Sequence, residues 1–191
     1  MRHPAVIAPL ADPAVFQRIG EQLLEAMGLD ITHESVQDTP RRWAHFWTEF
    51  LAYDDPSPPT TFTSQTLDQM VVVSGLRVWS LCEHHLLPFW VDLSIGYITH
   101  GRVLGLSKFG RIARQLGHSP QVQERLVTDI ADAIGMATGS PDVAVCASGE
   151  HLCMTMRGIR APHRMKSSIT RGLFREDART REEFFHLVNR P

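Results

Sequence analysis

Two short segments of this sequence combine cysteine with histidine, and both residue types bind metal ions. The first is Cys82-Glu83-His84-His85, whose spacing allows the thiol of Cys82 and the imidazole of His85 to reach one ion. The second contains Cys153, which can supply a third ligand. Thiolate and imidazole are the ligands that Zn²⁺ prefers in proteins. Together the two segments predict a zinc site.

The number of protein ligands separates a structural zinc site from a catalytic one. A closed structural site needs a fourth ligand, and the candidates are His84, His151 and Cys146. Cys146 lies in an apolar segment, where a small buried side chain is its more ordinary role. Three ligands leave a position for a water molecule, whose pKa the metal lowers toward ~7. A buried cysteine beside surface histidines, without any metal, is the simplest alternative for the first segment considered alone.

The alternation in His151-Leu152-Cys153-Met154-Thr155-Met156-Arg157 predicts a strand with one apolar face and one reactive face. On the reactive face, His151 lies ~6.6 Å from Cys153, close enough to exchange protons with a substrate at the metal. His84, beside a candidate ligand, is suited to the same role near neutral pH. On a straight strand Arg157 lies ~13 Å beyond Cys153, and its guanidinium can bind phosphate in a bidentate manner.

Two predicted helix starts carry further candidates for substrate binding. Ser107, Lys108 and Arg111 follow a predicted strand at the beginning of a helix, where the helix N-terminus also attracts phosphate. A solvated helix face is the competing interpretation of this basic pair. Gln123 and Glu124 begin another helix, outside its apolar stripe. Their pattern fits either a carboxylate favoured by the helix dipole or one that accepts hydrogen bonds from a guanine edge.

Length and composition are those of an ordinary globular domain. The chain has 191 residues, 43% hydrophobic and 21% charged, which is enough for one domain with a sizeable core. Its formal net charge of -2 gives no general attraction to nucleic acid or to an anionic membrane. Three cysteines are too few for a disulfide framework and favour a reducing compartment. Without a signal peptide pattern, or the ~20 apolar residues of a membrane span, we expect a cytoplasmic protein.

Hydrophobic periodicity predicts an α+β order of elements. The expected helices are 13–27, 39–51, 121–138 and a last helix that a capping box of Thr180 and Glu183 opens. The expected strands are 70–81, 91–97, 102–106, 143–147, 151–157 and 167–174. The fourth and fifth strands form a predicted hairpin that turns at Ser148-Gly149, and the proline-rich stretch 54–61 is a predicted linker. The expected domains are an N-terminal helical region with its linker, 1–60, and a catalytic domain, 61–191.

Four segments occur in a characteristic order: CEHHLLPF at 82–89, GLSK at 105–108, QVQERL at 121–126 and HLCMTMRG at 151–158. Together with DTPRR at 38–42 and REEF at 181–184, they strongly resemble GTP cyclohydrolase I. The resemblance implies the tunnelling fold (T-fold), an antiparallel sheet with helices on one face and an N-terminal helical extension. In this fold the subunits join their sheets into a barrel, commonly in a toroidal homodecamer with active sites at subunit interfaces.

The resemblance also implies an activity and a role for each candidate residue. Family members convert GTP and water to formate and 7,8-dihydroneopterin triphosphate, a product compatible with folate, pterin-cofactor or 7-deazaguanine synthesis. A zinc-held water attacks guanine C8, and ring opening, deformylation, an Amadori rearrangement and cyclisation follow. The implied zinc ligands are Cys82, His85 and Cys153, and the implied proton carriers are His84 and His151. The implied substrate contacts are Glu124 and Gln123 for guanine, Ser107 for ribose, and Lys108, Arg111, Arg157 and Arg42 for the triphosphate.

The sequence departs from the family pattern at two places. Gly110 stands where a larger residue is usual, and 161–168 is shorter and more basic than the usual serine- and threonine-rich stretch. Two other functions compete with the main hypothesis. One is a different tunnelling-fold activity on a purine or pterin, which the complete motif at 82–85 argues against. The other is a non-catalytic, zinc-stabilised assembly, which predicts four protein ligands and no convergence of Arg157, Lys108 and Arg111.

Overall fold

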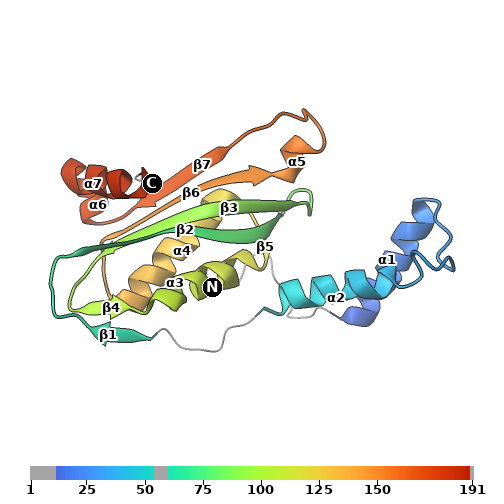
Figure 1. Ribbon diagram of the computed structural model, residues 1–191, viewed down its shortest axis with the longest axis horizontal. Coiled ribbons are helices and arrows are strands. Elements are labelled where there is room, and N and C mark those ends of the chain that lie inside the picture. The colour runs from blue at the N-terminus through green and yellow to red at the C-terminus, as the bar shows by residue number, and fades with distance from the viewer. Residues whose placement is uncertain (1–11, 54–59, 190–191) are drawn as a thin grey trace. The chain divides into compact units, whose positions relative to one another are not determined.

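The structure is a computed structural model that describes residues 12–53 and 60–189. The chain divides into two compact units between Asp54 and Asp55. Figure 1 shows the helices of the first unit in blue and cyan and the sheet of the second in green to red. Most of the predicted linker at 54–61 lies outside the described residues.

The N-terminal unit is a pair of helices, α1 (Pro13–Ala26) and α2 (Thr39–Leu51), as the periodicity predicted. The Asp12 side chain caps α1 by accepting a hydrogen bond from the backbone N–H of Ala14. Aromatic rings hold the two helices together. Phe16 of α1 stacks on Trp47 of α2, with ring centroids 5.6 Å apart and an angle of 7° between the rings. The aromatic side chains of α2 therefore form a packing surface within this unit.

The C-terminal unit is built on a five-stranded sheet in the order β5-β2-β3-β6-β7 (Figure 1). Its strands are β2 (Met70–Cys82), β3 (Pro88–Ile98), β5 (Pro120–Gln121), β6 (Val143–His151) and β7 (Met165–Thr170). All neighbours pair antiparallel except the short β5, which runs parallel to the end of β2. A second sheet pairs β1 (Thr61–Thr63) with β4 (Arg102–Leu104). The antiparallel sheet expected from the sequence is confirmed.

Two helices, α3 (Leu106–Gly117) and α4 (Gln123–Thr138), cover one face of the sheet and complete the expected α+β class. The main core lies between them and the sheet, because alternate β3 residues such as Val91 and Leu93 point toward the helices and are completely buried. On the opposite face, Phe184 of α7 (Ala178–Asn189) packs closely against Gly96. None of the helices in the described parts of the chain is long and apolar enough to cross a membrane.

The segment predicted as a strand at 151–157 is not one, and the predicted hairpin at Ser148-Gly149 is absent. β6 runs straight through that point to His151, and the chain then forms one helical turn, α5 (Leu152–Thr155). β6 pairs with β3 only as far as Phe89, opposite His151. Beyond it no strand offers hydrogen bonds, so the backbone closes on itself and Met156 N–H donates to Leu152 C=O. His151, Cys153 and Arg157 therefore do not share a strand face.

The C-terminal region differs from the prediction in two smaller ways. β7 ends at Thr170, and the chain turns into α6 (Leu173–Glu176) where an extended segment to 174 was expected. α7 begins at Ala178 because Asp177 caps it. The Asp177 carboxylate accepts hydrogen bonds from both the N–H and the hydroxyl of Thr180, so Thr180 is not the cap that the sequence suggested.

Gly149 allows β3 and β6 to approach closely just before the strand ends at His151. It pairs with Val91, and a Cβ at this position would lie 2.2 Å from the carbonyl oxygen of Trp90. Because that oxygen belongs to the neighbouring strand's backbone, β6 must shift to accept a side chain. We expect Gly149→Ala to lower the free energy of unfolding by about 3 kcal/mol, the upper end of ordinary overpacking costs. Chemical denaturation measures this change.

Gly110→Ala is the matched control for that substitution. Gly110 lies within α3, and a Cβ there meets nothing within 4 Å. Because alanine favours a helix over glycine by about 0.5–1 kcal/mol, we expect this variant to be slightly more stable than the natural chain. Equal stability of the two variants would contradict the close approach of β3 and β6 at Gly149.

Candidate metal centre and substrate site

Cys82, His85 and Cys153 come together in the structure as the sequence predicted. One ligand atom from each lies within 4.8 Å of the others, and the Cys82 sulfur is 3.8 Å from Nδ1 of His85. Cys82 ends β2, His85 lies in the turn that leads to β3, and Cys153 lies in α5. In Figure 1, that turn and α5 are at the same end of the sheet. The pairing of β3 with β6 thus brings Cys82 and His85, which precede β3, close to Cys153, which follows β6.

The turn that presents Cys82 and His85 is tightly built. Leu86 N–H donates to Cys82 C=O, and Cys82 N–H donates to Leu87 C=O, so the chain reverses within a few residues. Leu86 adopts a left-handed conformation with φ of 54° to complete the reversal. From α4, the Arg125 guanidinium forms an ion pair with Glu83 and donates a hydrogen bond to Gln121. This ion pair fixes the turn against the helix.

The donor set suits a divalent metal ion that prefers soft ligands. It offers two sulfur atoms and one imidazole nitrogen, the combination that Zn²⁺ binds well. Burial raises the pKa of the Cys153 thiol, and the neighbouring Cys82 raises it further because two thiolates repel each other. A bound cation stabilises both thiolates and reverses this effect. The pair of thiols therefore suits a site that holds a positive ion.

The structure separates the fourth-ligand candidates from this group of three. His84 is not a member of this group although its Nδ1 lies 3.9 Å from the Cys82 sulfur, and its side chain is 65% exposed. Cys146 lies in β6 among residues that face away from α4, on the other side of the sheet. His151 makes contacts of its own next to the cluster. Within the described residues the metal-ligating group has three members, which is the number of a catalytic zinc site.

His151 is half-buried and held on several sides. Its ring stacks on Phe89 with centroids 4.5 Å apart and an angle of 6°, and its Nε2 lies 3.0 Å from Oε1 of Gln123. The His163 ring is 6.1 Å away. Burial lowers the pKa of His151, the charge of His163 lowers it further, and Glu124 acts in the opposite direction. The imidazole is therefore biased toward its neutral form beside the metal cluster.

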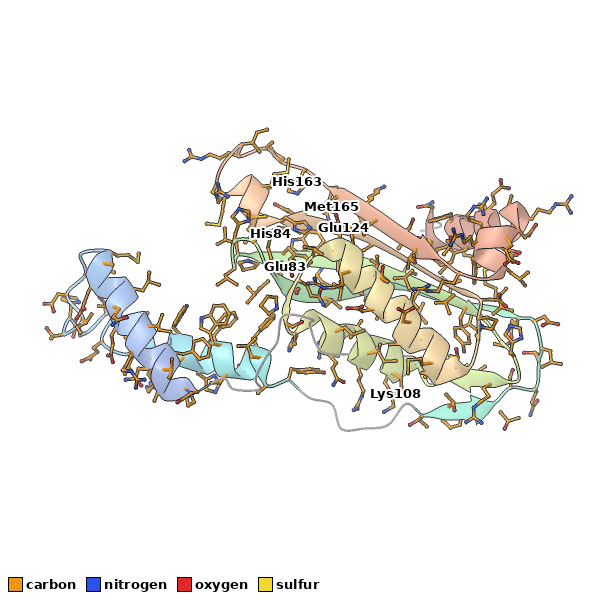
Figure 2. The ribbon with its side chains drawn as sticks, turned by 180° about the vertical axis from the view of Figure 1, so that it is seen from behind. Glu83, His84, Lys108, Glu124, His163 and Met165 are labelled. Carbon is orange, nitrogen blue, oxygen red and sulfur yellow. The ribbon has the colours of Figure 1, made fainter. Side chains whose placement is uncertain are left out.

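The candidates for substrate binding are not all gathered at this cluster, since Figure 2 shows Lys108 away from the end of α4 that carries Glu124. Lys108 is nearly buried in the first turn of α3, while Ser107 and Arg111 are exposed. Glu124 is exposed at the start of α4, and Arg157 is exposed just after α5. Figure 2 shows Glu83, His84, Glu124, His163 and Met165 at one end of α4.

The sequence did not predict the surroundings of two further residues, Gln123 and His163. Gln123 is completely buried and faces His151, where the sequence suggested a contact to guanine. His163 comes from the unusual 161–168 segment, and no spacing in the sequence marks it as a neighbour of His151. Arg42 belongs to the N-terminal unit, on α2, where it forms an ion pair with Asp38 at 3.2 Å.

Comparison with known proteins assigns the family. A sequence profile described as GTP cyclohydrolase I matches residues 16–189. The GTP cyclohydrolase 1 of Hyperthermus butylicus is 43% identical over 178 residues, covering 93% of this chain and 91% of its own. This chain belongs to the GTP cyclohydrolase I family. The GTP cyclohydrolase 1 of Methylococcus capsulatus is 39% identical over 184 residues, covering 93% of this chain and 98% of its own.

The family resemblance drawn from four sequence segments is thus confirmed, and the chain is an enzyme of the GTP cyclohydrolase I type. Among solved structures, the apo crystal structure of an archaeosine synthase QueF-Like protein is similar with a TM-score of 0.44 and 19% identity, over 54% of this chain and 93% of that one. At that level of similarity it adds nothing to the assignment.

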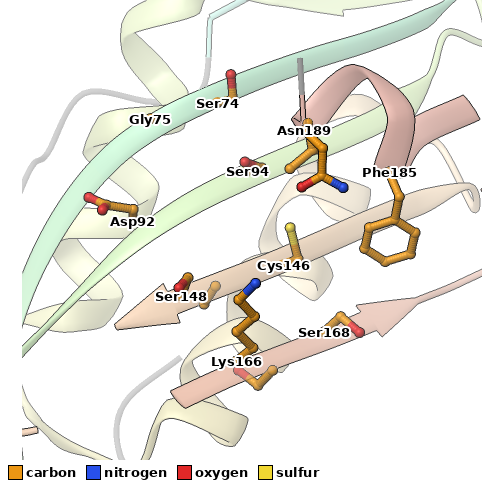
Figure 3. A pocket seen from close by; sticks show the side chains of 13 residues that line it. Ser74, Gly75, Asp92, Ser94, Cys146, Ser148, Lys166, Ser168, Phe185 and Asn189 are labelled. Carbon is orange, nitrogen blue, oxygen red and sulfur yellow. The ribbon is translucent and has the colours of Figure 1, made fainter. Parts of the chain in front are cut away.

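A cavity of about 560 Å³ lies on the sheet face opposite the metal cluster in this GTP cyclohydrolase I family member (Figure 3). Its polar lining includes Ser74, Ser94, Ser148, Lys166, Ser168 and Asn189. A bulge in β2, between Val73 and Leu76, displaces that strand beside the cavity. The lining contains none of Cys82, His85 and Cys153 and none of the predicted proton carriers or substrate contacts, but it includes Cys146, the fourth-ligand candidate on this face. The metal cluster and the cavity are therefore separate features on opposite faces of the sheet.

Proposed function

We propose that this chain converts GTP and water to formate and 7,8-dihydroneopterin triphosphate, with Zn²⁺ held by Cys82, His85 and Cys153. The observation that carries the proposal is the convergence of these three ligand atoms within 4.8 Å beside His151. A three-ligand site argues against the alternative of a purely structural zinc, which uses four protein ligands. Membership of the GTP cyclohydrolase I family supports GTP as the substrate.

The metal and the two histidines divide the chemistry between them. When bound, Zn²⁺ lowers the pKa of a water toward ~7 and so supplies the nucleophile for guanine C8. His151, held beside the cluster and biased toward the neutral form, accepts a proton during hydration and returns one as the imidazole ring opens. His84, exposed on the turn, exchanges protons with solvent during deformylation. Amadori rearrangement of the opened ribose and cyclisation then complete the pterin.

Charged and polar side chains hold the two ends of GTP. Glu124 accepts hydrogen bonds from the guanine edge, and its exposure at the start of α4 leaves it available. Ser107 contacts the ribose. The triphosphate is bound by four basic residues, of which Lys108 also benefits from the N-terminus of α3. These residues are Lys108, Arg111, Arg157 and Arg42.

We further propose a cytoplasmic homodecamer with active sites at subunit interfaces, built from the catalytic domain 61–191. β7 is the last strand of the sheet, and on the other side β5 covers only the end of β2. Both sheet edges therefore offer backbone hydrogen bonds to neighbouring copies, as a barrel of joined sheets requires. All three cysteines are free thiols, which suits a reducing compartment.

The direct test is to incubate zinc-replete protein with GTP and to follow formate and pterin absorbance together. Both products should appear at the same rate. Formate without pterin would mean that the reaction stops after ring opening, and neither product from metal-loaded protein would refute the proposed function.

Arg157→Ala tests whether Arg157 binds the triphosphate of GTP. Because a hydrogen bond to a charged group contributes about 1.5–3 kcal/mol, we expect KM for GTP to rise about 10–100-fold while kcat changes little. Steady-state kinetics measure both. Arg160→Ala removes an exposed arginine three residues further on and serves as the control. An unchanged KM in the Arg157 variant, or an equal rise in the Arg160 variant, would contradict the role.

A further inference from the structure

We propose that Gln123 is a positioning residue that fixes the tautomer and orientation of the His151 imidazole. This inference rests on the proposed function, in which His151 carries protons. It replaces the guanine contact that the family resemblance implied for Gln123 with a role inside the protein.

The amide of Gln123 is completely buried, and its orientation is determined by its partners. Its Nε2 lies 3.2 Å from the carbonyl oxygen of Met165 and 3.0 Å from Oγ of Ser167. A backbone carbonyl can only accept a hydrogen bond, so the group facing Met165 must be the NH₂ of the amide. Rotating the amide by 180° would bring two oxygens together. The amide oxygen must therefore face His151.

The orientation of the amide in turn determines which nitrogen of His151 carries hydrogen. Oε1 of Gln123 can only accept, and it lies 3.0 Å from Nε2 of His151. Nε2 must therefore be the N–H donor. In the neutral ring the lone pair then belongs to Nδ1, which becomes the nitrogen available to take a proton. The parallel stack on Phe89 keeps the ring from rotating out of this arrangement.

The same contacts leave Gln123 unsuited to bind the substrate directly. Both N–H groups and the oxygen of its side chain are engaged within the protein, and none of its surface is exposed. Its partners lie at the start of β7 and at the end of β6, so the side chain joins three elements at the edge of the metal cluster. Figure 2 shows Met165 beside Glu124 at this end of α4.

Two substitutions of Gln123 test the role. Gln123→Met keeps the size of the side chain and removes the acceptor. Residues that orient a group in a metal site typically contribute 10–100-fold, so we expect kcat to fall by about that factor, with KM for GTP and the zinc content unchanged. Gln123→Glu retains an oxygen facing Nε2 but turns its second oxygen toward the Met165 carbonyl, so it should keep the Nε2–H tautomer at a cost in stability. Thr138→Ala, a buried polar change at the far end of α4, is the control and should keep full turnover.

A second readout follows the tautomer directly and does not depend on activity. In protein labelled with ¹⁵N-histidine, two-bond ¹H–¹⁵N correlations should identify the neutral His151 ring as the Nε2–H form, and Gln123→Met should abolish this preference. The kinetics overturn the inference if Gln123→Met raises KM at constant kcat, if it retains full kcat, or if its turnover falls only in proportion to a loss of bound zinc. The NMR experiment overturns it if the His151 ring of the unmodified chain carries its hydrogen on Nδ1. The proposed function fails separately, if the unmodified chain makes no formate from GTP.

Discussion

Replacement of His85 by alanine is expected to remove the metal ion and to reduce formate release by on the order of 10³-fold or more. The physical reason is that a metal contributes several kcal/mol to the stabilisation of a transition state, and each 1.36 kcal/mol is a factor of ten in rate. His85 is one of only three protein ligands in the group, so its loss leaves two thiols that cannot hold the ion in place. Elemental analysis of the purified variant and a formate assay measure the two effects.

The fold should survive this substitution, because the His85 side chain is exposed on the turn between β2 and β3. His186→Ala, which removes an exposed histidine from α7, is the matched control and should retain both metal and activity. A His85 variant that keeps one ion per chain and normal turnover would show that the metal, if any, binds elsewhere.

His151→Ala should separate metal binding from proton transfer. We expect this variant to keep one zinc ion per chain and to lose turnover by about 10²–10⁴-fold, the usual contribution of a general acid–base group. His151 precedes Cys153 by two residues and is not one of the three ligands, and the partners of its ring include Gln123 and Phe89. The contrast with His85→Ala is the informative part, because one variant loses metal with activity and the other loses activity alone.

Single-turnover measurements of formate sharpen this test. If His151 moves protons in the ring-opening steps, the first turnover itself must be slow. A normal first turnover followed by slow cycling would instead place the defect in product release. Full steady-state activity in the His151 variant would remove the residue from the mechanism.

The metal cluster was predictable because its two halves are short local motifs. Cys82 and His85 are three residues apart and reach the same point through a single turn. The contribution of Cys153 followed from residue type alone, since cysteine near histidine favours zinc. The main helices and the strands β2 and β3 were also predictable, because long apolar patterns with a clear period decide their type.

The surroundings of His151 were not predictable from local patterns. Alternation over 151–157 favoured a strand, but a strand needs a partner, and the partner β3 ends its pairing at Phe89. Whether a neighbouring strand continues is a property of the whole sheet. The same holds for Gln123, whose bonds to Met165 and His151 join segments far apart in the sequence. The sequence marked residues that meet near this site, and it did not predict that Gln123 and His151 contact each other.

The most direct test of the central claim is a zinc titration of metal-free protein, with formate release from GTP as the readout. The three-ligand site predicts that the rate rises in proportion to added zinc and levels off at one ion per chain, and that a chelator reverses the gain. Formate production that is unaffected by the chelator, or a plateau at a different stoichiometry, would contradict catalysis at Cys82, His85 and Cys153.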